Sequence, residues 1–315
     1  MTRQDGPLAD RPLADRTGSG LASAVSAYGL WGLMPLYFLL LVPSGPVEIV
    51  AWRILLSAVT CVVFLTLARG WRRLGRLVAD RRAVLTLGLA SALIVVNWLV
   101  YVYASVSAQV VEAALGYFIN PIVTVLLGVL VQRDRLRPLQ WAAIAVSAVA
   151  VVVLVIAYGR VPWISLVLAL SFGGYGLVKK RLGDRVDALG GLTVETLWLA
   201  APAAVALAVV AASGALRMGT VSGWHTLATL MAGLVTTVPL LLFAAATRRL
   251  PLAIVGLSQY LTPVIQFTVG VALLGERMPT VRWIGFAIVW VALLVLTVDM
   301  LSSARSARRA LVEPV

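Results

Sequence analysis

Long apolar segments alternate with short polar connections along most of the 315-residue chain. Each segment is close to the length of about 20 residues that a helix needs to cross the hydrocarbon core of a bilayer. The polar residues 1–20 are expected to form a disordered cytoplasmic tail, and residues 302–315 a second cytoplasmic tail. Between them the pattern predicts ten membrane-spanning helices, at residues 21–42, 46–68, 83–104, 110–131, 139–157, 162–178, 191–213, 224–245, 252–274 and 281–301.

The composition fixes the class of protein. Hydrophobic residues make up 61% of the chain and charged residues 12%, whereas a soluble protein is about half apolar and about a quarter charged. A surface with so few charges could not be wetted, which excludes a soluble domain. The fold class predicted is therefore an all-α polytopic membrane protein, with no room for a large catalytic head.

The net charge of +13 would suit a nucleic-acid partner, but the positions of the basic residues favour another explanation. With the N-terminus placed in the cytoplasm, 21 of the 26 Lys and Arg residues fall in cytoplasmic segments. Basic residues collect in the cytoplasmic loops of membrane proteins. This bias predicts both termini in the cytoplasm, and the lipid bilayer in place of nucleic acid as a partner. The outer loops hold only Arg160, Arg217, Arg277 and Arg282.

The residues that usually hold metals and cofactors are scarce. The chain has one cysteine, Cys61, and one histidine, His225, so an intramolecular disulfide and a multi-histidine metal site are excluded. His225 is expected at an outer edge without a catalytic role. No stretch fits the phosphate-binding pattern GxxxxGK[ST], so ATP hydrolysis is not expected. We expect no metal, no cofactor and no enzymatic activity.

An internal repeat divides the chain into residues 21–157 and 158–301. When the sequence is compared with itself at an offset of 142 residues, the end of the first half aligns with the end of the second half without a gap. A second similarity links residues 28–33 to residues 172–177. Each half has five spans, and because five is odd, the second half enters the membrane from the opposite side. Such inverted repeats are characteristic of secondary transporters. The pairs matched by the shift are Pro121 with Pro263, Gly128 with Gly270, Asp134-Arg135 with Glu276-Arg277, and Trp141 with Trp283.

Several stretches carry a resemblance to a known family. They include YGLWGLMPLYF at 28–38, EIVAWR at 48–53, EAALGYFINP at 112–121 and GLSQYLTPVIQF at 256–267. The chain resembles the drug/metabolite transporter superfamily, with two EamA-type repeats, and within it the RarD group of chloramphenicol-sensitivity proteins. The resemblance implies a carrier in the bacterial inner membrane that exports small organic molecules, and it defines no particular substrate.

Polar side chains at intervals of four residues mark one face of two equivalent spans. In a helix, residues four apart share a face, and a proline beside each face frees a carbonyl and bends the helix. We expect kinks at Pro121 and Pro263, and the hypothesis is that the two faces line a central cavity, joined by Asn97 and Tyr101. The alternative is polar packing between helices with no ligand role. The faces are Glu112, Gly116, Asn120 and Thr124 in the fourth span, and Ile254, Ser258, Thr262 and Gln266 in the ninth.

Four ionisable residues inside or beside the spans are candidates for the substrate and ion pathway, because charges in a membrane are costly. Glu112 is interpreted either as a proton-coupling group with a raised pKa or as a carboxylate hydrated at a helix N-terminus. Arg53 is expected to form an ion pair with a carboxylate or to bind a substrate anion, and Glu48 lies five residues before it. Glu195 is either functional or interfacial.

Aromatic residues in the spans could stack on a ligand, although most membrane Trp and Tyr residues are packing or interface residues. The candidates in the pathway are Trp31, Tyr117 and Tyr260. Glycines at 29, 32, 173, 174 and 176 are expected to allow close helix approach.

The leading hypothesis is a secondary transporter that moves a small-molecule substrate by alternating access, with possible proton coupling. The alternatives are an integral-membrane enzyme acting on lipid-linked substrates and a membrane assembly factor or sensor without transport. No pattern in the sequence specifies an oligomeric state.

Overall fold

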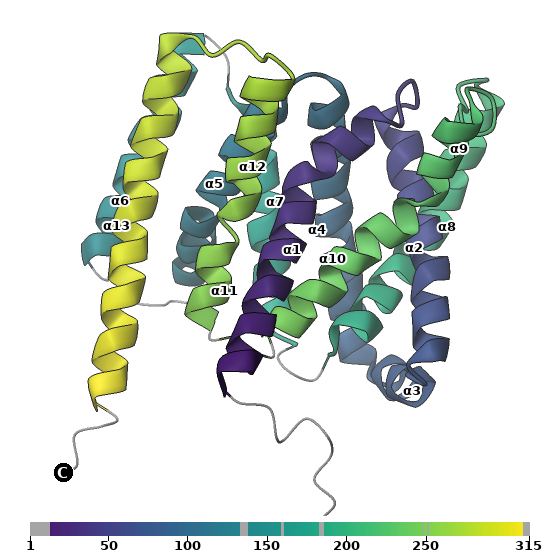
Figure 1. Cartoon of the computed structure of the whole chain (residues 1–315), viewed down its shortest axis with the longest axis horizontal. Helices are drawn as coiled ribbons and strands as arrows, with labels where there is room; N and C mark the ends of the chain where they lie inside the picture. Colours follow the sequence, from purple (N-terminus) through teal and green to yellow (C-terminus); the bar gives the residue numbers. More distant parts are fainter. Residues whose placement is uncertain are drawn as a thin grey trace, which may run out of the picture.

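The computed structural model describes residues 13–132, 138–158, 161–182, 186–247, 249–250 and 252–310, and all regular structure in these residues is helical. The helices run side by side as one bundle, with the start of α1 and the end of α13 at the same end (Figure 1). We call this the terminal end and the opposite one the distal end. The first repeat contains α1 (Leu13–Leu39), α2 (Pro46–Leu67), α3 (Trp71–Ala79), α4 (Arg81–Val106), α5 (Val110–Leu127), η1 (Gly128–Gln132) and α6 (Pro138–Tyr158). The second contains α7 (Trp163–Lys180), α8 (Ala188–Ala212), α9 (Gly223–Leu230), α10 (Ala232–Thr247), α11 (Leu252–Ser258), α12 (Leu261–Thr268), η3 (Val269–Leu273) and α13 (Thr280–Ala310).

The helices account for the ten predicted spans. Eight helical segments among the described residues are long and apolar enough to cross a membrane. The remaining two spans are α6, with an apolar part at Pro138–Ala150, and α7. Many large apolar side chains, such as Leu67 and Leu294, are exposed on the outside of the bundle, where lipid covers them in a membrane. The predicted fold class, two five-span halves of an all-α membrane protein, is confirmed.

Several element boundaries differ from the prediction. Helix α1 begins at Leu13, inside the expected tail, and α13 extends to Ala310, beyond the expected end of its span. Residues 1–12 and 311–315 lie outside the described residues. The short helix α3 was not predicted; it buries Leu74 and exposes Arg72 and Arg73, as expected for a helix lying along a membrane surface. The eighth span is two helices, α9 and α10, and the ninth is α11 and α12.

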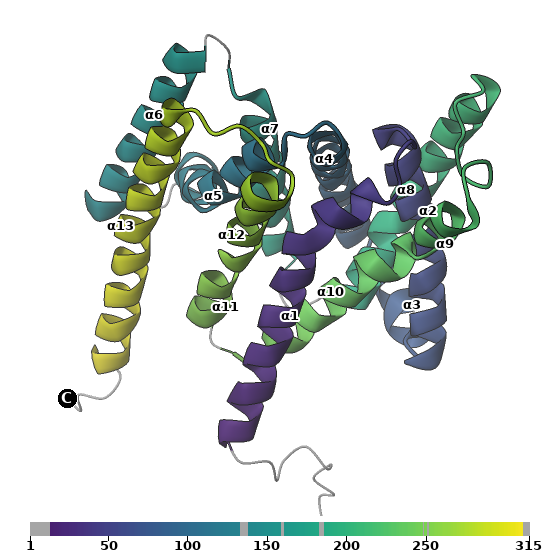
Figure 2. The same ribbon diagram turned by 45° about the horizontal axis from the view of Figure 1, so that its top comes forward.

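The packing of the helices follows the internal repeat. Helix α5 packs on α7, and the equivalent pair is α12 on α1. Likewise, α4 packs on α7, and the equivalent pair is α10 on α1. Helix α2 packs on its own equivalent in the second half, α8, and α6 packs on its equivalent, α13. Exchanging the two halves therefore maps the contacts onto one another. The pair α6 and α13 stands at one edge of the bundle in both views (Figure 1 and Figure 2).

The two prolines of the repeat have different effects on their helices. Pro121 lies within α5, which continues through it, whereas Pro263 follows an interruption at Gln259–Tyr260 that separates α11 from α12. A proline ring clashes with the carbonyl four residues earlier, which for Pro263 is the carbonyl of Gln259. Beyond each proline the helix ends in a π-helical turn, η1 or η3, at equivalent positions of the two halves.

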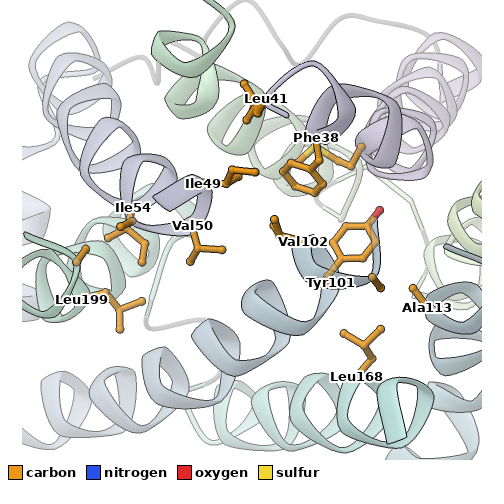
Figure 3. Packing of buried hydrophobic residues seen from close by; sticks show 14 of the residues in the cluster. Phe38, Leu41, Ile49, Val50, Ile54, Tyr101, Val102, Ala113, Leu168 and Leu199 are labelled. Carbon is orange, nitrogen blue, oxygen red and sulfur yellow. The ribbon is translucent and has the colours of Figure 1, made fainter. Parts of the chain in front are cut away.

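The central core joins both halves. It is formed by buried side chains from α1, α2, α4, α5, α7 and α8 (Figure 3). In it the ring of Tyr101 on α4 points toward Phe38 on α1, with ring centroids 5.7 Å apart. The polar residues described next lie beside this core.

Candidate functional site

A buried arginine is the centre of the site. Arg53 lies seven residues into α2, about 10 Å along the helix from its distal end, and is only 5% exposed. Its Nε donates a hydrogen bond of 2.7 Å to Thr236 Oγ1 on α10. Its Cζ lies 4.3 Å from the ring centroid of Trp98 and 5.8 Å from that of Phe38. Its Nη1 is buried without a hydrogen-bond partner.

Three tyrosines from three helices, Tyr37, Tyr101 and Tyr117, lie in the surroundings of this arginine. The Tyr37 hydroxyl donates to the Ala228 carbonyl at 2.9 Å. The Tyr117 hydroxyl donates to Asn97 Oδ1 at 3.0 Å. The third is Tyr101, whose ring contacts that of Tyr117 edge to face. The guanidinium therefore lies among aromatic rings and hydroxyls.

Two amide side chains connect this group to other helices. Asn97 on α4 donates from Nδ2 to the Leu168 carbonyl and to Ser171 Oγ on α7, both at 3.2 Å. Gln266 on α12 donates to the Tyr101 hydroxyl at 2.7 Å, and that hydroxyl donates to the Trp31 carbonyl on α1. The four predicted pathway residues Asn97, Tyr101, Tyr117 and Gln266 thus form two hydrogen-bonded pairs, Asn97 with Tyr117 and Tyr101 with Gln266. The two pairs meet at the ring contact of Tyr101 with Tyr117, and they include members from both halves.

Arg53 is not neutralised by a carboxylate. Among the described residues, no acidic side chain lies within ion-pair distance of its guanidinium. Glu48 is 1% exposed, and its carboxylate instead accepts hydrogen bonds from the backbone N–H groups of Arg217 and Met218, at 2.8 to 3.1 Å. It fixes a loop at the distal end. Of the two alternatives for Arg53, an ion pair or binding of a substrate anion, the described residues therefore do not supply the ion pair.

The polar face of α5 packs against α7. A Cβ added to Gly116 would lie 2.8 Å from the Ser165 carbonyl oxygen, so the two backbones are in close contact there. Ser165 Oγ donates to the Glu112 carbonyl at 2.6 Å. Asn120 is buried with its Oδ1 unpartnered, and Thr124 is exposed. Glu112, with a buried side chain, Gly116 and Asn120 thus lie at the helix interface, whereas Thr124 does not.

The equivalent face of the ninth span packs against α1. Thr262 Oγ1 donates to the Tyr28 carbonyl at 2.8 Å, and Ser258 Oγ bonds only within its own helix among the described residues. Gly32 on α1 allows the close approach, since an added Cβ would lie 2.7 Å from Ile265. Each polar face thus has its own partner helix, α7 for the fourth span and α1 for the ninth, while α12 also packs on α5. The hypothesis that the two faces line a central cavity stays a prediction.

Glu195 takes part in an ion pair near the terminal end. Its Oε1 lies 2.6 Å from Lys179 Nζ, and its Oε2 accepts a hydrogen bond from the Tyr175 hydroxyl at 3.3 Å. The Glu195 side chain is 5% exposed, so it is a buried, paired group and not an interfacial one. The pair joins α7 to α8 and does not contact Arg53.

The remaining candidates lie away from the arginine. Tyr260 lines an apolar hollow of about 430 Å³ between α5, α12 and α13, with Phe118 and Trp290. His225 is buried at the distal end, where its Nε2 lies 3.0 Å from the Leu41 carbonyl and 3.2 Å from Ser44 Oγ. Of the five glycines expected to allow close helix approach, Gly32 and Gly173 lie in close contacts and Gly174 in an ordinary one, whereas a Cβ added to Gly29 or Gly176 would have no neighbour within 4 Å.

A further buried acid connects the repeats at the distal end. Glu276 accepts hydrogen bonds from the backbone N–H groups of Val110 and Val111 at the start of α5, at 2.5 and 3.1 Å. Burial raises the pKa of its carboxyl above the ordinary value, although these bonds and Arg282 act in the opposite direction. The described residues contain no group of three or more His, Cys, Asp or Glu that could hold a metal ion.

Sequence reasoning missed some partners of Arg53. Thr236, Tyr37, Phe38 and Trp98 were not among the residues predicted to line the pathway. Thr236 follows Arg53 by 183 positions, and an isolated threonine in an apolar span carries no signal of its own. The unusual arginine could be found from the sequence, whereas its surroundings required the packing of α2 on α4 and α10.

Fold and site together define a class: a helical membrane protein of two inverted five-span repeats with a buried polar network between them. The match to a family model agrees, since the model of the EamA-like transporter family matches twice, at residues 18–156 and 161–298. The chain belongs to the EamA-like transporter family, within the drug/metabolite transporter superfamily, and is a membrane transporter of that family.

Relatives support this assignment over nearly the whole chain. Protein RarD of Streptomyces exfoliatus is 45% identical, over 93% of this chain and 92% of its own length. Protein RarD of Escherichia coli is 37% identical, over 93% and 98%. A protein of Vibrio cholerae described as an uncharacterized transporter is 38% identical, over 92% and 96%. A solved crystal structure shares the fold with a TM-score of 0.57 at 20% identity, covering 90% of this chain and 98% of the other.

Proposed function

We propose that this chain is a secondary transporter that exports small organic metabolites or drugs across the bacterial inner membrane by alternating access. The observation that carries the proposal is the exchange symmetry of the packing: α5 on α7 has its equivalent in α12 on α1. A carrier built of inverted repeats can open to either side when the halves exchange conformations. The buried polar residues Arg53, Asn97 and Gln266 lie between helices that would move.

The proposed orientation places both termini in the cytoplasm. The terminal end carries a hollow of about 500 Å³ whose lining includes four arginines, as the positive-inside rule leads one to expect of a cytoplasmic surface. A fluorescent protein that folds only in the cytoplasm, fused to the C-terminus, should be bright, and a fusion in the loop at 214–222 should be dark. The reverse pattern would overturn this orientation. The lining arginines are Arg73, Arg76, Arg82 and Arg181.

Proton coupling is proposed to act through Glu112. Its side chain is 8% exposed, at the start of α5 and next to the close contact of α5 with α7. A buried carboxyl that changes its protonation when two helices separate can link proton movement to that separation.

Flux in proteoliposomes tests both parts. Purified protein should take up or release labelled chloramphenicol or an amino-acid mixture, and an imposed pH gradient should accelerate this flux. Glu112→Gln should retain flux down a solute gradient but lose its response to the pH gradient. Glu48→Gln is the matched control, because Glu48 is equally buried but binds only backbone groups among the described residues. A Glu112→Gln protein with an unchanged pH response would refute the coupling role, and product formation without flux would indicate an enzyme.

A further inference from the structure

Among the residues that the structure describes, Arg53 has no counter-ion for its charge. The guanidinium is enclosed by α1, α2, α4 and α10, and one of its nitrogen atoms, Nη1, is buried without a partner. A charge placed in a membrane interior without a partner is costly, and native spans pair such residues or use them for ligands. The contact with the face of Trp98 offsets only part of this cost.

Three other buried acids bind groups other than Arg53. Glu48 binds the backbone of Arg217 and Met218, and Glu195 binds Lys179. Glu276 binds the N-terminus of α5. What is missing from the site is therefore an anion that the described part of the protein does not supply.

We propose that Arg53 binds the carboxylate of the transported solute, so that the substrates are small organic carboxylates with an aromatic or apolar body. The inference deepens the proposed transport function and rests on it. Nη1 can donate to a carboxylate oxygen, while Thr236 holds Nε and Trp98 covers one face of the guanidinium. The rings of Phe38, Tyr101 and Tyr117 then offer an aromatic surface for the rest of the molecule.

The position of Arg53 in the bundle supports a role in transport. Arg53 is about 10 Å from the distal end of α2, and it contacts α4 of its own half and α10 of the other half. Separation of these helices would expose the guanidinium to water. A bound anion would neutralise the charge and so favour the state in which the helices are packed together again. Binding of the anion would thus be linked to closure of the site.

The test compares three probes of similar size: benzoate, its neutral analogue benzamide, and the cation benzylamine. Ligand binding to the native state raises the melting temperature of the purified full chain. Benzoate at one hundred times its Kd should raise it by about 5 °C, and the other two probes should have no effect. Arg53→Gln should raise the Kd for benzoate by at least about tenfold, and Arg53→Lys should retain a weaker preference for the carboxylate.

A purely structural arginine would give a different result. Arg53→Gln removes a buried charge without a partner, so the variant should melt at the wild-type temperature or above it when no ligand is present. A lower melting temperature together with unchanged benzoate binding would overturn the proposal. So would stabilisation by benzamide or benzylamine equal to that by benzoate, or no effect of benzoate on the wild type.

Flux measurements separate this inference from the proposed function. Proteoliposomes that transport benzylamine or benzamide but not benzoate would overturn the carboxylate specificity and leave the transporter intact. Benzoate flux that Arg53→Gln abolishes, while the variant keeps its fold, would support both.

Discussion

The contact of Gly116 with Ser165 gives a sharp prediction about the interface between α5 and α7. In Gly116→Ala, the new Cβ would lie 2.8 Å from the Ser165 carbonyl oxygen and 2.9 Å from its Cα. Both are backbone atoms, so no side-chain rotation can relieve the clash. An ordinary contact of about 3.5 Å therefore requires the two helices to separate by a large fraction of an ångström.

The cost of this separation can be placed in a range. Overpacking a well-packed interface costs about 1 to 3 kcal/mol, and the displacement also lengthens the 2.6 Å hydrogen bond from Ser165 Oγ to the Glu112 carbonyl. At about 2 to 4 °C per kcal/mol, Gly116→Ala should lower the melting temperature by about 5 °C. Size-exclusion chromatography of a fluorescent fusion after heating measures this in detergent without complete purification.

The matched control is Gly29→Ala on α1, where an added Cβ has no neighbour within 4 Å. Because alanine favours the helix by about 1 kcal/mol over glycine, the control should melt at the wild-type temperature or slightly above it. If Gly116→Ala is as stable as Gly29→Ala, the close contact of α5 and α7 does not exist in the membrane-extracted protein, and the reasoning fails.

Two further predictions concern buried acids. Lys179→Met leaves Glu195 buried without its cation, and should destabilise the protein by on the order of 3 kcal/mol; the double variant with Glu195→Gln should recover most of this loss in the same melting assay, whereas additive losses would contradict a direct pair. Burial raises the pKa of the Glu276 carboxyl above its ordinary value, so the folded state holds this proton more tightly than the unfolded state. Stability should therefore fall as the pH rises from about 4.5 through the folded pKa, and Glu276→Gln should make this part of the melting profile flatter; an unchanged slope would contradict the assignment.

The spans could be predicted because membrane insertion depends on a property that the sequence states directly, the length of apolar runs. Helix ends depend on local propensity instead, which is why α1 could begin at Leu13 within a polar segment. The surface helix α3 was missed because its nine residues bury only Leu74, too short an apolar signal to distinguish it from a basic loop.

The candidate site was only partly predictable. Periodicity identified which residues share a face of α5, but not which helix that face contacts. The identity of the contacted helix depends on the close approach of Gly116 to the backbone of Ser165, which follows it by 49 positions in the sequence. Glu48 was recognised as costly, yet its partners are backbone N–H groups of the loop at 217–218, and such groups have no sequence signature.

The two π-helical turns, η1 at Gly128–Gln132 and η3 at Val269–Leu273, have a consequence for the direction of transport. Because the halves run in opposite directions, one wide turn lies near each surface of the bilayer. Conversion of a π-turn to an α-turn shifts the register of the following residues by one position, a rotation of about 100°. Each surface thus has one position at which a helix could change its register. If the chain works by the proposed alternating access, the same one-residue deletion made in η1 and in η3 should bias the carrier toward opposite sides of the membrane.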